Sequence, residues 1–82
     1  MKYTIKTTTE TEVDVPAYWT STAQFYFHKL LPNGQVLEVS VIKDAPHIKL
    51  TSVESGVYCG VNQCSEEIFN NALTIAKTYL NL

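Results

Sequence analysis

The two cysteines are the residues whose types and spacing most directly suggest chemistry. Cys59 and Cys64 lie in the segment GVYCGVNQCSEE, residues 56–67, with four residues between them. A structural zinc site needs four ligands, and only His28 and His47 are available to complete one. Because these four residues do not follow the spacing of known zinc fingers, we predict no metal ion and no cofactor.

The two thiols have other states open to them. A redox pair favours the spacing Cys-x-x-Cys, which this sequence lacks. A disulfide can close across four residues if the loop folds back, although cysteines of cytosolic proteins are usually reduced. We favour free thiols, with Cys64 packing against Phe69 or Ile68 where a helix begins. An exposed thiol at a helix N-terminus would have a lowered pKa and would be reactive.

A histidine and a glutamate are the other candidates for acid–base chemistry. His28 and Glu38 face each other across a predicted hairpin. Cross-strand pairs of this kind contribute only about 0.2–1 kcal/mol, and a flat sheet face is a poor place for catalysis. The sequence has no nucleophile elbow, and its three glycines are dispersed rather than gathered in a phosphate-binding loop. We therefore assign no catalytic residue and expect no enzymatic activity.

Alternation of apolar and polar residues predicts the strands that position these side chains. Residues 3–15 alternate over a length that requires a bend, a bulge or a division into two strands within TTTET. Residues 23–31, 35–43 and 47–53 predict three further strands joined by short turns, which is typical of an antiparallel meander. The segment PAYWTS, after Pro16, is expected to be a connection.

The turn LPNG sets the register of the central hairpin. Pro32 favours a type I turn, with Gly34 as the left-handed bulge residue of a three-residue loop. This register makes one face apolar and the other polar. On the apolar face it places Phe25, Phe27 and Lys29 opposite Val41, Val39 and Leu37. On the polar face it places Tyr26 opposite Ser40 and His28 opposite Glu38.

The C-terminal segment predicts a helix over residues 66–81. Ser65 is a good N-cap, Glu66 and Glu67 oppose the positive end of the helix dipole, and an apolar stripe follows at helical spacing. The predicted fold of residues 1–82 is a single α+β domain, a four- or five-stranded antiparallel meander with this helix packed on one face. The face with Phe25 and Phe27 is the expected contact.

Composition argues against a nucleic-acid-binding protein. The net charge is −2, and all six basic residues are scattered lysines, so the sequence lacks the arginines that grip phosphates and guanines. The alternative of a single-strand binder depends on an exposed stacking platform. Its members would be Tyr18, Trp19, Tyr26, His28 and Tyr58.

The acidic residues of the first strand offer a different kind of surface. Glu10, Glu12 and Asp14 share one side of it and could mimic a phosphate backbone. We favour the simpler interpretation of a charged edge that prevents aggregation. The N-terminus lacks the apolar region of a signal peptide, and no apolar run is long enough to span a membrane, so we expect a cytoplasmic protein.

Two segments resemble small accessory proteins of phages and mobile elements of Bacteroides-type bacteria. They are TIKTTTETEVDVPAYW and CSEEIFNNAL. The resemblance implies a protein that works by binding another protein, such as an inhibitor of a host factor in CRISPR defence. The expected interaction surface is an uncovered sheet face and a neighbouring aromatic corner, formed by Tyr18, Trp19, Tyr26, His28, Glu38 and Ser40. A homodimer through that face or a strand edge, or a purely structural role, is the alternative.

Overall fold

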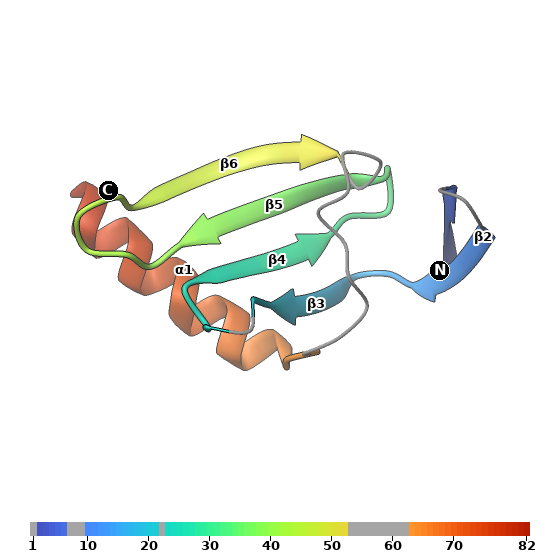
Figure 1. Cartoon of the computed structure of the whole chain (residues 1–82), viewed down its shortest axis with the longest axis horizontal. Coiled ribbons are helices and arrows are strands. Elements are labelled where there is room, and N and C mark those ends of the chain that lie inside the picture. Colours follow the sequence, from blue (N-terminus) through green and yellow to red (C-terminus); the bar gives the residue numbers. More distant parts are fainter. Residues whose placement is uncertain (1, 7–9, 22, 53–62) are drawn as a thin grey trace.

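The chain forms two antiparallel sheets and one helix (Figure 1). The computed structural model describes residues 2–6, 10–21, 23–52 and 63–82. A two-stranded sheet consists of β1 (Lys2–Lys6) and β2 (Glu10–Asp14). A four-stranded meander follows in the order β3 (Ala17–Thr20), β4 (Tyr26–Leu30), β5 (Gln35–Ser40) and β6 (His47–Ser52). Helix α1 (Glu66–Leu80) crosses one face of this meander, which confirms the predicted α+β fold.

The first predicted strand is two strands. β1 and β2 pair with Tyr3 opposite Val13, so the division within TTTET is the alternative that holds. Tyr3 and Val13 turn inward and pack against a buried cluster, whereas Glu12 and Asp14 are exposed, as the alternation predicts. The cluster consists of Val15, Trp19, Leu30 and Val36.

The prediction that PAYWTS is a connection is wrong, because its central residues form the edge strand β3. Tyr18 lies opposite Lys29 and Trp19 opposite His28 in the ladder with β4. Pro16 does not disturb this pairing, since a proline is tolerated immediately before an edge strand. Tyrosine, tryptophan and threonine all favour strands, so the composition of this segment already carried the signal.

The central hairpin has the predicted register and the predicted loop. Phe27 lies opposite Val39, and His28 lies opposite Glu38. Gly34 N donates to Leu31 O at 3.0 Å and Leu31 N donates to Gln35 O at 2.8 Å, while Gly34 adopts a φ of 86°. These are the bonds of a type I turn followed by a left-handed bulge residue.

Helix α1 begins and packs as its sequence predicts. Ser65 Oγ accepts a hydrogen bond from Ile68 N at 3.1 Å, and Glu66 and Glu67 occupy the first turn. The helix stops at Leu80 because Asn81 adopts a left-handed conformation. Its buried residues pack with two strand residues in a single apolar cluster. The members of the cluster are Phe69, Ala72, Ala76, Phe27 and Val39.

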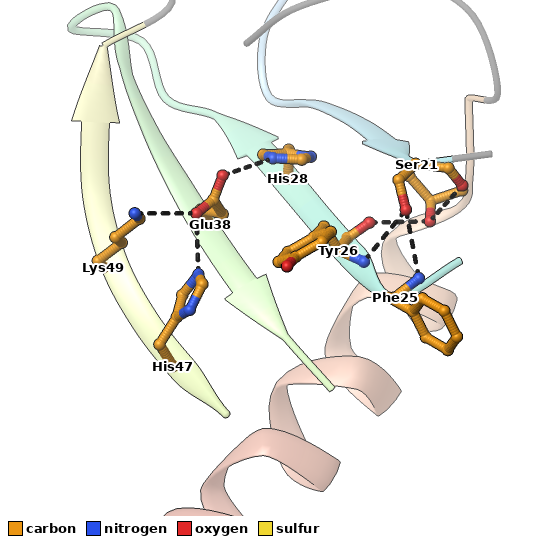
Figure 2. Close-up of polar contacts among 8 residues, drawn as sticks. Ser21, Phe25, Tyr26, His28, Glu38, His47 and Lys49 are labelled. Carbon is orange, nitrogen blue, oxygen red and sulfur yellow. Dashed lines mark hydrogen bonds and ion pairs between the residues drawn. The ribbon is translucent and has the colours of Figure 1, made fainter. Parts of the chain in front are cut away.

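Phe25 does not lie under the helix, which corrects the predicted contact. Strand β4 begins at Tyr26, and the chain before it makes a tight turn in which Gln24 has a φ of 60°. Ser21 Oγ accepts hydrogen bonds from Phe25 N at 3.2 Å and Tyr26 N at 3.3 Å, which fixes this turn (Figure 2). Phe25 is left 52% exposed at the end of the sheet.

Replacing Gly34 by alanine should destabilise the fold for two separable reasons. A left-handed φ costs a residue with a Cβ about 1–2 kcal/mol, and a Cβ at Gly34 would also collide with the Tyr3 ring. We expect Gly34→Ala to lower the free energy of unfolding, measured by urea denaturation, by more than the backbone cost alone.

The matched control is the same substitution in a Tyr3→Ala background. There the collision is absent, so the loss from Gly34→Ala should shrink to about 1–2 kcal/mol. An equal loss in both backgrounds would show that the β1–β2 hairpin does not pack on the Leu31–Gln35 turn.

Candidate functional site

Four polar side chains meet on the sheet face opposite α1, around the carboxylate of Glu38 (Figure 2). Glu38 Oε1 lies 3.0 Å from Nε2 of His28 on β4. Glu38 Oε2 lies 2.8 Å from Nε2 of His47 and 3.4 Å from Nζ of Lys49, both on β6. The carboxylate of Glu38, on β5, therefore links β5 to β4 and to the edge strand β6.

The strand registers bring these residues together. His28 and Lys49 are the direct cross-strand neighbours of Glu38, and His47 is opposite Ser40, two positions along β5. Because side chains on a strand alternate between faces, all four project to the same side. The predicted His28–Glu38 pair is confirmed, and it is one part of a larger cluster.

The face was expected to be open to solvent, and for two of its residues that expectation is wrong. His28 and Ser40 are buried. The Trp19 ring stacks on the His28 ring, with centroids 5.1 Å apart and planes within 11° of parallel. Ser40 Oγ donates to Ala45 O at 2.9 Å, so its hydroxyl is used inside the β5–β6 connection. The tryptophan that covers this face comes from β3, the strand that the sequence pattern did not predict.

Burial and hydrogen bonding act on Glu38 in opposite directions. Burial alone raises the pKa of its carboxyl, but the hydrogen bonds from His28, His47 and Lys49 together outweigh this and hold the pKa below its ordinary value of 4.5. The carboxyl group, only 14% exposed, is thus ionised at neutral pH.

An ionised carboxylate can only accept hydrogen bonds, so Nε2 of each histidine carries the hydrogen that points at Glu38. The Nδ1 atom of His28 is buried and has no hydrogen-bond partner within the described part of the chain. A carboxylate that orients an imidazole is also found in acid–base catalysis. Here, however, the carboxylate bonds two imidazoles and an ammonium at once, an arrangement that ties strands together.

Two of the predicted site residues remain on the surface. Tyr26 is exposed and its ring lies 6.0 Å from that of His47. Tyr18 is half-buried on the helix side of β3, where its ring contacts Phe69 and lies beneath Lys29 Nζ. Tyr18 and Trp19 therefore face opposite sides of the sheet. The proposed stacking platform does not form from its described members, and Tyr58 lies outside the described residues.

The sequence reasoning missed His47 and Lys49. The signal was present, because the turn at Pro46 and the predicted strand over residues 47–53 together fix a β5–β6 register. The LPNG turn sets the register of the central hairpin alone, whereas Glu38 lies in both the β4–β5 and the β5–β6 ladder.

Cys64 has a structural position, and Cys59 lies outside the described residues. Cys64 is a free thiol that packs against the cluster containing Phe69, as predicted. Burial raises the pKa of this thiol, so the lowered pKa of an exposed thiol at a helix start does not apply. Among the described residues no group of histidine, cysteine and acidic side chains is arranged to hold a metal ion.

Two hollows adjoin Cys64. One of about 410 Å³ lies between β2 and β3 and is bordered by Glu12, Asp14 and Tyr18. The other, of about 280 Å³, lies between the end of β3 and the start of α1 and is bordered by Ser21, Gln24 and Ile68. Neither is lined by Glu38 or a histidine, so the polar cluster is not the wall of either hollow.

Helix α1 carries an exposed apolar surface, which we call the α1 flank. It consists of Ile68, Ile75 and Tyr79, which are 49%, 43% and 40% exposed. Their spacing of seven and four residues places them on one side of the helix, next to the buried stripe. The other side is polar, with Asn70, Thr74 and Lys77.

No known protein family, characterised protein sequence or solved structure matches this chain. Within the described residues, no helix has both the length and the apolar character that crossing a bilayer requires.

The acid stability of the protein should depend on Glu38. Its pKa is lower in the folded chain than the ordinary 4.5, so its ionised form stabilises the fold above about pH 4.5, and this contribution is lost as the pH falls through the lower folded value. We expect Glu38→Gln to lower the free energy of unfolding at pH 7 by about 1–3 kcal/mol, measured by urea denaturation. The same variant should lose less stability than the unmodified protein when the pH is lowered from neutral to acidic.

The control is Glu12→Gln, because Glu12 is exposed on β2. This variant should change stability by less than about 0.5 kcal/mol and leave the acid-induced fall unchanged. If Glu38→Gln showed the same pH profile as the unmodified protein, Glu38 would not be the carboxyl that the cluster stabilises.

Proposed function

We propose that this chain is a non-enzymatic protein-binding module that docks a partner on the α1 flank. The observation that supports this is a continuous side of α1 with three large, partly exposed apolar residues, Ile68, Ile75 and Tyr79. A helix in a small domain ordinarily presents polar residues beside its buried stripe, and here only one side does so.

The flank has the composition of an interface core. Tyrosine is enriched at protein interfaces, and charged residues are depleted at their centres. None of the three flank residues is charged, whereas Lys77 lies on the polar side of the helix. Covering such side chains contributes a favourable binding free energy of about 25 cal/mol for each Å² of apolar surface removed from water.

A hollow at one end of the flank adds shape to this surface. Ile68 borders the hollow of about 280 Å³ together with Thr20, Phe27 and Cys64. A partner that lies along α1 can insert an apolar side chain there, because interface hot spots are commonly anchors seated in such hollows. Phe25 lies next to Gln24, which borders the same hollow, and is itself exposed.

The nature of the partner stays a prediction from the resemblance of the sequence. An accessory protein of a phage or mobile element would use the flank to occupy a surface of a host protein, such as a component of a defence system.

The flank is tested by a charge introduced at its centre. Ile75→Lys should remove the capture of specific proteins from a lysate by immobilised protein, because a lysine would have to be buried in the interface. The fold should persist, since Ile75 is 43% exposed, and circular dichroism checks this.

Asn70→Lys is the matched control, because it introduces the same charge on the polar side of the same helix. The proteins captured by Asn70→Lys should be those captured by the unmodified chain. Capture that survives Ile75→Lys, or that consists of nucleic acid alone, would contradict the proposal.

A further inference from the structure

We infer that the outer edge of β6 pairs with the β6 strand of a second copy of this chain, so that two meanders join into one continuous eight-stranded antiparallel sheet. This inference is independent of the α1 flank, and it rests on the backbone hydrogen bonds of the sheet edges and on the residues of β6.

The register shows which backbone groups of β6 point outward. Val41 N donates to Phe25 O and Leu31 N donates to Gln35 O, so the odd-numbered residues of β5 bond to β4. The even-numbered residues of β5 then bond to β6, opposite His47, Lys49 and Thr51. The N–H and C=O groups of Ile48 and Leu50 therefore face away from the sheet.

The two edges of the meander differ. At the β3 edge, Cys64 N donates to Tyr18 O at 3.1 Å, and Gln63 bridges to Trp19, so the chain covers its own edge there. At the β6 edge no backbone hydrogen bond to Ile48 or Leu50 is found among the described residues. Figure 1 shows β6 as the outermost strand of the sheet on that side.

β6 has one of the features by which proteins protect an edge strand, the lysine Lys49, and lacks others. It contains no proline, and its pairing with β5 runs without a bulge from His47 to Ser52. Lys49 Nζ lies 3.4 Å from Glu38 Oε2, and His47 Nε2 lies 2.8 Å from the same oxygen, while the Lys49 side chain is 58% exposed. Leu50, an apolar residue of this edge strand, is 56% exposed on the helix side of the sheet.

A second copy of β6 fits this edge in a register centred on Leu50. Pairing about Leu50 brings the two Leu50 side chains together on the two-fold axis and sets Lys49 opposite Thr51 of the second copy. A shift of one step would set Lys49 opposite Lys49, and like charges directly opposite are destabilising. In the favoured register the outward groups of Ile48 and Leu50 all find partners, and the exposed leucines are covered.

The oligomeric state of the full chain tests this inference. Light scattering on a concentration series up to about 1 mM should give a mass that approaches twice that of one chain. Leu50→Lys should weaken the association at least about tenfold, because two lysines would meet on the axis. In the dimer, the amides of Ile48 and Leu50 should exchange with deuterium more slowly as concentration rises.

Ile75→Lys is the matched control, since it introduces the same charge at an exposed residue of α1. It should leave the dimer intact, which separates this test from that of the α1 flank. A monomer at about 1 mM, a dimer unaffected by Leu50→Lys, or a dimer lost in Ile75→Lys would each overturn the inference.

Discussion

The carboxylate of Glu38 is the interaction on which the arrangement of the meander depends. It is almost buried in the sheet face, and it is kept ionised by hydrogen bonds from both histidines of the chain and from Lys49. A buried charge of this kind is costly unless its partners are in place, so β4 and β6, which carry the partners, are held in register with β5. Trp19 on the edge strand β3 covers the cluster by stacking on His28 of β4.

This cluster also determines which surfaces remain for other molecules. One face of the meander is used by α1 and the other by the polar cluster, Trp19 and the β1–β2 hairpin. Lys49 and His47 are turned toward Glu38, and the Lys49 side chain is still 58% exposed at this edge. The α1 flank and the β6 edge are left, and the two proposals assign one to a partner protein and the other to a second copy.

Much of the fold follows from the sequence, because its local signals agree with one another. The LPNG turn gave the register of the central hairpin, and Ser65 with the apolar stripe gave the helix within one residue of its end. The errors came from tertiary packing. Pro16 indicated a connection where the short strand β3 begins, so β3 was not predicted. Because Trp19 lies on β3, the sequence pattern predicted an exposed face around His28 and Ser40, which are buried. The site was found only as the pair His28 and Glu38, because His47 and Lys49 join it through a second ladder.

The most direct test of the Glu38 cluster is a titration of the Glu38 side-chain carboxyl carbon followed by NMR. The account predicts a midpoint below 4.5, and a midpoint that rises when His47 is replaced by alanine, because one of the hydrogen bonds to the carboxylate is then lost. A midpoint at or above 4.5 in the unmodified protein would show that burial outweighs the hydrogen bonds, and the carboxylate would not hold the strands as described.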